Sequence, residues 1–114
     1  MAGTLTLINS TVHSNSALAG YGDYESYAHG GGVAVWDGSA LVQNSTITGN
    51  QTSGNGNISQ GVGRGGGLSF ELNDGTLKNT IVAQNSDDFD NDINDETNNG
   101  ITYEGQNFIG FNDG

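Results

Sequence analysis

Acidic residues alternate along one short stretch near the end of the chain, at Asp88, Asp90 and Asp92. Carboxylate oxygens are ligands that Ca²⁺ prefers in proteins, and alternating positions supply the first ligands of many calcium-binding loops. Such loops also have glycine at the sixth position and an acid at the twelfth. Counted from Asp88, these positions hold Ile93 and Asn99. Two interpretations therefore stay open: a looser calcium site on the three aspartates, or a solvated acidic loop.

Four aromatic residues lie close together in the sequence, at Tyr21, Tyr24, Tyr27 and Trp36. Aromatic faces stack against sugar rings, and the acidic residues between the tyrosines would accept hydrogen bonds from sugar hydroxyls. We therefore take these four residues as candidate carbohydrate-binding residues. The alternative is that the tyrosines pack the surrounding segment against the rest of the protein. Trp36 follows a strand residue that we expect to be buried, so alternation predicts that its side chain points outward.

Catalytic residues are harder to find. Asp37 and Asp74 follow two predicted strands, and a hydrolase needs two carboxylates about 5–10 Å apart. Each of them also precedes a glycine, which is a turn signature that needs no catalytic explanation. His13 and His29 lie far apart in the sequence and have no second type of ligand at a useful spacing. We therefore predict that the chain carries no catalytic residue and is not an enzyme.

The charge of the protein limits its partners. The 114 residues include 13 acidic side chains against Arg64 and Lys78, for a formal net charge of −11. A nucleic acid or an anionic membrane surface would be repelled, and no apolar run approaches the roughly 18 residues of a membrane-spanning helix. We expect neither nucleic-acid binding nor membrane insertion. Cysteine is absent, which excludes disulfides, CxxC metal sites and thiol nucleophiles.

The elements that would position these residues belong to a repeat. GGGVAVW at residues 30–36 returns as GGGLSF at residues 65–70, an offset of 35 residues. The same offset carries NSTVHSN (9–15) onto NSTITGN (44–50), and this stretch onto NTIVAQN (79–85). A fixed period in this range is typical of repeat architectures.

Each copy contains short stretches in which apolar residues occupy every second position, such as Val33 and Val35. This alternation predicts short strands with one buried face. The buried parity changes at Asn9, Asn44 and Asn79, which a straight strand does not allow. Asparagine tolerates the left-handed backbone conformation that a bend needs. The triple glycines predict tight corners, because glycine accepts positive φ and a close neighbouring backbone at little cost.

Together these features predict an all-β fold, a right-handed parallel β-helix (a solenoid) of about three rungs that forms a single domain over residues 1–114. The copies span approximately residues 3–29, 30–64 and 65–99, and residues 100–114 form a closing rung. Because repeat material begins by Leu5, we expect the chain to be a piece of a longer array.

Stacking of the copies would bring like residues into columns. Two columns of asparagine are expected to form structural ladders of amide hydrogen bonds, namely Asn9, Asn44 and Asn79, and Asn15, Asn50 and Asn85. Uncapped ends would expose strand edges, so end-to-end self-association is a further expectation.

The two full copies, GGGVAVWDGSALVQNSTITGN and GGGLSFELNDGTLKNTIVAQN, resemble repeats of bacterial cell-surface right-handed parallel β-helix proteins, of the polymorphic outer-membrane protein and choice-of-anchor Q groups. The end of the chain, GITYEGQNFIG (100–110), is similar to the closing rung of the choice-of-anchor Q type. The resemblance implies export and display on a bacterial surface, where neither signal nor anchor is expected within this piece.

On this basis we expect a non-enzymatic, structural or adhesive module, cell-surface or secreted, with a polysaccharide or a host or cell surface as partner. Ca²⁺ is the only cofactor that the sequence raises. The alternative is a polysaccharide lyase or hydrolase whose catalytic residues lie mostly outside this piece.

Overall fold

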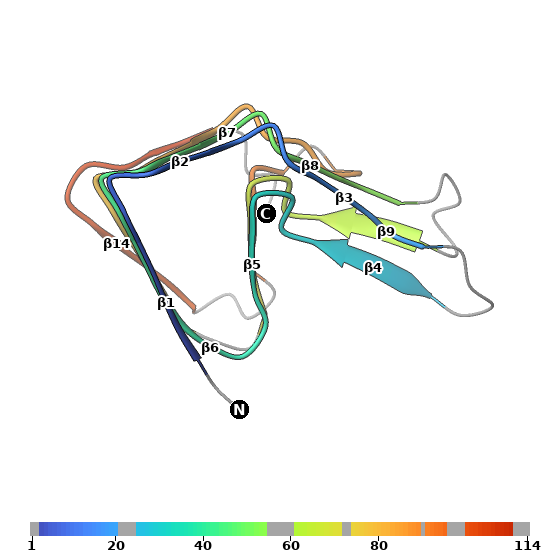
Figure 1. The fold of residues 1–114 in the computed structure, drawn as a ribbon, viewed down its shortest axis with the longest axis horizontal. Helices are drawn as coiled ribbons and strands as arrows, with labels where there is room; N and C mark the ends of the chain where they lie inside the picture. The colour runs from blue at the N-terminus through green and yellow to red at the C-terminus, as the bar shows by residue number, and fades with distance from the viewer. Residues whose placement is uncertain are drawn as a thin grey trace.

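The protein is built from short parallel strands (Figure 1). The computed structural model describes residues 3–20, 25–54, 61–71, 74–89, 91–95 and 100–110. Within these ranges every strand pair is parallel. The same residues form no helix, and so none that is long and apolar enough to cross a bilayer. The all-β class with parallel sheets is therefore confirmed.

The largest sheet takes one strand from each copy and one from the closing stretch, residues 100–110. Its order is β1 (Gly3–Ile8), β6 (Gly38–Gln43), β11 (Gly75–Lys78) and β14 (Ile101–Glu104). Ala40 pairs with Leu5 on one side and with Gly75 on the other, and both offsets are 35 residues. Gly75 pairs in turn with Ile101 at a shorter offset. The strand register therefore has the same period as the sequence and shortens at the closing stretch.

Two further sheets complete the enclosure of the interior. One contains β15 (Phe108–Ile109), β12 (Ile81–Ala83), β7 (Thr46–Thr48) and β2 (Thr11–His13) in this order. The other contains β13 (Ile93–Asp95), β10 (Leu68–Phe70) and β5 (Val33–Val35). In Figure 1 the three larger sheets surround the interior like the sides of a triangle.

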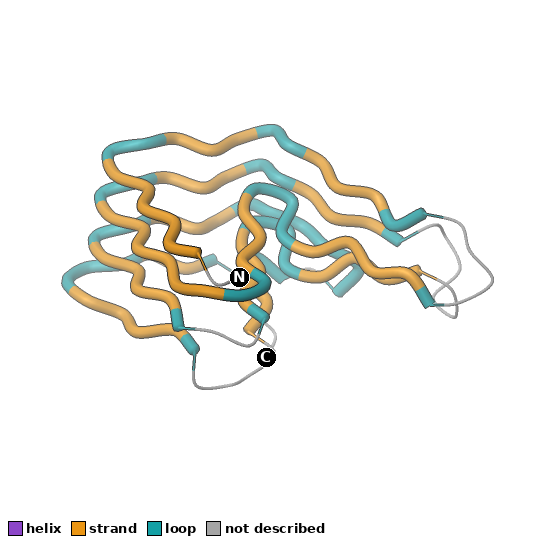
Figure 2. Tube along the Cα trace, turned by 60° about the horizontal axis from the view of Figure 1, so that its bottom comes forward, coloured by secondary structure: helices purple, strands orange, loops and turns teal. Residues whose placement is uncertain are grey.

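Two small sheets extend from one side of this triangle. They pair β3 (Ser16–Leu18) with β8 (Gln51–Ser53), and β4 (Ser26–His29) with β9 (Gly61–Arg64). Figure 2 shows that these strands, too, run beside their equivalents from the neighbouring copy. The described parts of the segments between the second asparagine and the triple glycine therefore lie together on the same side.

The core lies between the three larger sheets. Its buried members are Val35, Ala40, Val42, Ile47, Leu68, Phe70, Leu77, Val82 and Ile93. Phe70 is fully buried, and its ring lies so close to Gly75 that a Cβ at that position would collide with it. The φ of Gly75 is not positive, so its backbone conformation does not require glycine. The missing side chain instead makes room for the Phe70 ring. The first copy contributes less: Leu5 is 38% exposed, because its strand lies at the edge of the sheet.

The corners use left-handed backbone. Asn9, Asn44 and Asn79 have φ of 51°, 50° and 49°, which accounts for the change of buried parity at these residues. Gly30 and Gly65, the first residues of the two triple glycines, have φ of 58° and 64°. The triple glycines therefore turn the chain immediately before β5 and β10.

One column of amides, buried at Asn50 and Asn85 and exposed at Asn15, joins the copies. The side-chain oxygen of Asn50 accepts hydrogen bonds from the backbone N–H (3.0 Å) and the Nδ2 (2.9 Å) of Asn15. Asn85 Oδ1 accepts the same two bonds from Asn50, at 3.0 and 2.9 Å. The column ends at the buried carboxylate of Asp92, whose Oδ1 accepts two bonds of 2.7 Å from Asn85.

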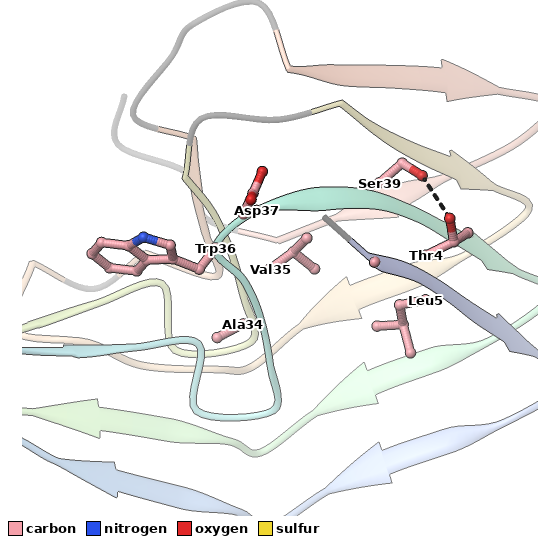
Figure 3. Close-up of a pocket in the computed structure, with 8 residues that line it drawn as sticks. Thr4, Leu5, Ala34, Val35, Trp36, Asp37 and Ser39 are labelled. Carbon is pink, nitrogen blue, oxygen red and sulfur yellow. Dashed lines mark hydrogen bonds between the residues drawn. The ribbon is translucent and has the colours of Figure 1, made fainter. Parts of the chain in front are cut away.

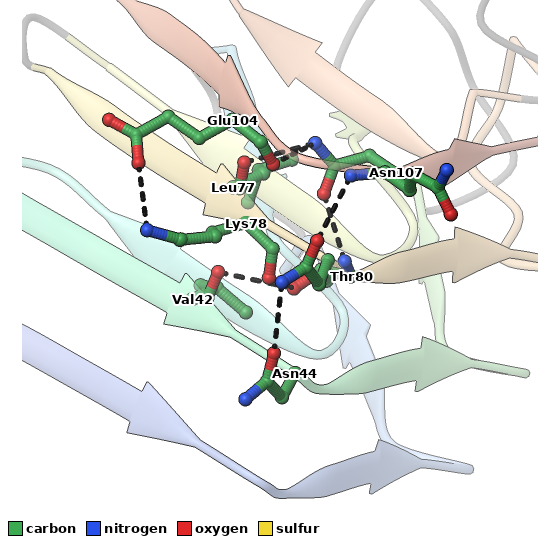
Figure 4. A network of polar contacts seen from close by, with 9 residues as sticks. Val42, Asn44, Leu77, Lys78, Thr80, Glu104 and Asn107 are labelled. Atoms are coloured by element: carbon green, nitrogen blue, oxygen red, sulfur yellow. Dashed lines mark hydrogen bonds and ion pairs between the residues drawn. The ribbon is translucent and has the colours of Figure 1, made fainter.

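A second set of polar contacts lies at the corner that contains Asn44 and Asn79 (Figure 4). The Nδ2 of Asn79 donates to Asn44 Oδ1 at 3.3 Å, and both amides are exposed. The neighbouring Thr80 is fully buried; its hydroxyl donates to the carbonyls of Val42 and Lys78. Asn107 accepts the backbone N–H of Thr80, so the closing stretch supplies the last hydrogen-bonding partner of this corner. For Asn9 the contact at this corner is made by its backbone N–H, which donates to the Gln43 carbonyl.

Candidate functional site

Five side chains of different chemistry line one concave site at the base of the small sheets. They are Tyr27, His29, Trp36, Arg64 and Glu71, and the cavity between them has a volume of about 270 Å³. We call these five residues the aromatic site. Its members combine two aromatic rings, an imidazole, a guanidinium and a carboxylate within a small space.

The 35-residue register positions these side chains. His29 at the end of β4 pairs with Arg64 at the end of β9. Trp36 and Glu71 directly follow β5 and β10, which also pair at this offset, and the Glu71 N–H donates to the carbonyl of Val35 at 3.0 Å. The tight glycine corner between β4 and β5 brings the first pair next to the second.

Both aromatic rings lie next to the imidazole. The ring centroids of His29 and Trp36 are 5.5 Å apart at 84°, and those of His29 and Tyr27 are 5.8 Å apart at 40°. Trp36 is 61% exposed and Tyr27 is 43% exposed. The guanidinium carbon of Arg64 lies 4.8 Å from the centroid of the Tyr27 ring, within the range of a cation–π contact. Both aromatic residues therefore stay partly open to solvent beside charged and polar groups.

His29 and Glu71 form the floor of the site. The Nδ1 of His29 contacts Glu71 Oε1, and both side chains are largely buried. Burial lowers the pKa of His29 below its usual value, and the positive charge of Arg64 acts in the same direction. The Glu71 carboxylate opposes this shift without cancelling it. The imidazole is therefore mainly neutral at neutral pH.

Tyr27 is held by a neighbouring acid. Its hydroxyl donates to Glu25 Oε2 at 2.7 Å, and this hydrogen bond is the main reason why the pKa of Tyr27 is raised above 10.0. The other two tyrosines of the predicted binding set, Tyr21 and Tyr24, lie outside the described residues. Of the four residues predicted to bind carbohydrate, the structure thus brings Tyr27 and Trp36 to one site.

The acidic stretch ties segments of the chain together. Asp88 Oδ2 accepts the backbone N–H groups of Gly54 and Gly63, both at 2.7 Å, while Asp92 Oδ1 accepts two bonds from Asn85. Asp90, the third predicted calcium ligand, lies outside the described residues. Among the residues that the structure describes, no group of three or more His, Asp or Glu side chains could hold a metal ion. The two described aspartates thus hold different parts of the backbone.

The members of the other two candidate pairs do not line a common cavity. Asp37 lines a cavity of about 500 Å³ at the edge of the first copy, whereas Asp74 lines a different one beside Lys78. His13 belongs to β2, where its Nδ1 contacts the Ser14 hydroxyl at 2.7 Å, and His29 belongs to β4. The structure does not bring either pair to a shared site.

Sequence reasoning did not assemble the polar half of the aromatic site. His29 was considered as a metal ligand, and Arg64 was considered as one of the two basic residues of the chain. Glu71 was not considered. The signal was nevertheless present, because the 35-residue offset that aligns the copies also aligns His29 with Arg64 and Trp36 with Glu71.

The aromatic site offers stacking faces together with hydrogen-bond donors and acceptors, which is the usual chemistry of small-molecule recognition. A comparison of the chain with protein-family models, curated proteins and solved structures gave no match. The geometry of the aromatic site is therefore the basis for assigning a function.

Proposed function

We propose that the chain is a right-handed parallel β-helix module of a secreted or cell-surface bacterial protein. The 35-residue register of seven strand pairs supports this architecture, since each sheet takes strands from successive copies. Crossover connections between parallel strands of one sheet are almost always right-handed, which supports the handedness. The bacterial surface location rests on the resemblance of the GGG and NST repeats to cell-surface β-helix proteins.

Within this module, the proposed function is non-enzymatic binding of carbohydrate, in an adhesive or structural role. The observation that carries the proposal is the pair of exposed aromatic residues, Tyr27 and Trp36, both next to a largely buried polar floor. Large exposed aromatic surface costs free energy in water unless a partner covers it. A sugar ring covers such a surface with its apolar face and directs its hydroxyls to the polar groups.

Binding to polysaccharides is tested with a pull-down on insoluble glucan, xylan, chitin and polygalacturonate, with and without Ca²⁺. We expect retention of the protein by at least one polymer and its loss in Trp36→Ala, because this substitution removes the larger exposed ring. Phe108→Ala is the matched control, since Phe108 is equally exposed (63%) but lies in β15, on another sheet.

The same incubations distinguish binding from catalysis. A reducing-end assay and an absorbance assay for unsaturated products should stay at the level of the blank. New reducing ends or unsaturated products would contradict the proposal and favour a polysaccharide hydrolase or lyase. Absence of binding to every polymer would also contradict it and leave a purely structural spacer.

A further inference from the structure

Trp36 lines two cavities at once. One is the aromatic site. The other has a volume of about 500 Å³ and lies at the edge of the first copy, where β1 faces the end of β5. Figure 3 shows the Trp36 ring pointing away from Thr4 and Leu5, and this direction agrees with its edge contact to His29. The residue thus stands at the junction of two adjoining cavities.

The second cavity has the lining of a ligand site. Its walls include the apolar side chains of Leu5 and Val35, and its polar groups are the Asp37 carboxylate and the hydroxyls of Thr4 and Ser39. These two hydroxyl oxygens are 3.4 Å apart. Ligand pockets typically join apolar walls to a few polar groups and measure roughly 300–1,000 Å³. The second cavity falls within this range, and the aromatic site, at about 270 Å³, falls just below it.

Charge decides which kind of carbohydrate fits. Each cavity carries a carboxylate, Asp37 in one and Glu71 in the other, and the chain has a formal net charge of −11. The cation at the site, Arg64, is placed above the Tyr27 ring. A polymer with a carboxylate on every sugar would be repelled over a distance of about 8 Å at physiological salt. A neutral sugar avoids this cost and donates its hydroxyls to the carboxylates.

We propose that both cavities hold one ligand, a linear neutral polysaccharide that crosses the indole of Trp36. This inference rests on the proposed function and adds to it the length and the charge of the ligand. The sugar above Trp36 stacks on the exposed ring, and its neighbours on either side occupy the aromatic site and the second cavity. The affinity must then increase with chain length up to the number of sugars that fills both cavities.

The test is titration calorimetry with neutral oligosaccharides of two and six units, derived from the polymer that retains the protein. We expect the hexasaccharide to bind at least about tenfold more tightly than the disaccharide, because only the longer ligand reaches both cavities. Ala34→Phe fills the second cavity from an exposed position of β5. This variant should reduce the advantage of the hexasaccharide to about threefold or less.

Thr11→Phe, an exposed substitution on β2, is the matched control and should keep the advantage of the longer ligand. Ser39→Phe, also exposed and part of the same cavity, replaces Ala34→Phe if that variant does not fold by circular dichroism. Equal affinities for the two lengths, or an unchanged advantage in the filled variant, would overturn the two-cavity proposal and leave carbohydrate binding intact. Tighter binding of oligogalacturonate than of every neutral oligosaccharide would overturn the charge assignment. No binding of any saccharide would remove the proposed function itself.

Discussion

The same 35-residue register builds the amide column and the aromatic site, but the copies carry identical residues along the column and different residues at the site. Along the column the copies carry the same residue, Asn15, Asn50 and Asn85, and each amide finds an identical partner one copy away. At the aromatic site the copies carry different residues, so that His29 lies beside Arg64. Positions that hold the same residue in each copy stabilise the structure. Positions that hold different residues bring different functional groups together.

Substitutions in the amide column should lower the free energy of unfolding more than substitutions elsewhere. Asn50 is 1% exposed, and its amide bonds to Asn15, Asn85 and the carbonyls of Val12 and Thr48. Asn50→Ala removes the side-chain hydrogen bonds of a buried position and leaves Asn85 Oδ1 with only the backbone N–H of residue 50, so we expect the free energy of unfolding to fall by about 2–3 kcal/mol. Urea denaturation followed by circular dichroism measures the change.

The matched control is Asn44→Gly, which removes an exposed amide and keeps the left-handed corner. We expect its effect to stay within about 0.5 kcal/mol. Equal losses in the two variants would show that the buried column has no special importance for stability.

The aromatic site should instead make stability depend on pH. Burial lowers the pKa of His29 in the folded protein, while the unfolded chain keeps the ordinary value of about 6.5. The unfolded state therefore binds the proton first as the pH falls, and the free energy of unfolding decreases below about pH 6.5 until the folded-state pKa is passed. Thermal or urea unfolding between pH 7.5 and 5 measures this dependence.

His29→Gln should flatten the dependence in this window, and His13→Gln, at an exposed position of β2, should not. Identical pH profiles for the wild type and His29→Gln would contradict the burial of a neutral imidazole at the site.

A smaller effect is expected where copies share a conformation but not a residue. Ser14, Gly49 and Gln84 all have positive φ, at 57°, 63° and 61°, and glycine adopts this conformation with the least strain. Transferring the residue of the second copy to the third, as Gln84→Gly, should raise the free energy of unfolding by about 0.5–1 kcal/mol. A decrease, measured by the same urea titration, would show that the Gln84 side chain makes a stabilising contact.

The sequence was sufficient for the strands next to the asparagine and glycine corners, for the bends and for the period, because these features depend on local patterns that recur. It did not predict the strands of the two small sheets, β3, β4, β8 and β9. Alternation located β5 and β10, and the parity change located the left-handed asparagines. Exposure of Trp36 also followed from alternation, and the structure confirms it at 61%.

The aromatic site was only half predicted, because its polar residues come from different copies. Tyr27 and Trp36 could be named for their type alone, whereas Glu71 becomes relevant only when its position beside Trp36 is known. The roles of Asp88 and Asp92 were missed for a similar reason. Gly54 reaches Asp88 from the preceding copy, whereas Asn85 lies only seven residues before Asp92 and contacts it through the fold of the intervening loop. Alternation of acids along one segment indicates neither contact.

The register itself can be measured directly, because the natural chain contains no cysteine. Thr4 pairs with Ser39, and their hydroxyl oxygens are 3.4 Å apart, so Thr4→Cys with Ser39→Cys should form a disulfide under mild oxidation. Thr6→Cys with Ser39→Cys, shifted by two residues, is the control and should stay reduced. Rapid quantitative oxidation of the first pair alone, seen by thiol titration and mass spectrometry, is the predicted result. Oxidation of the shifted pair at the same rate or faster would contradict the 35-residue register and the site built on it.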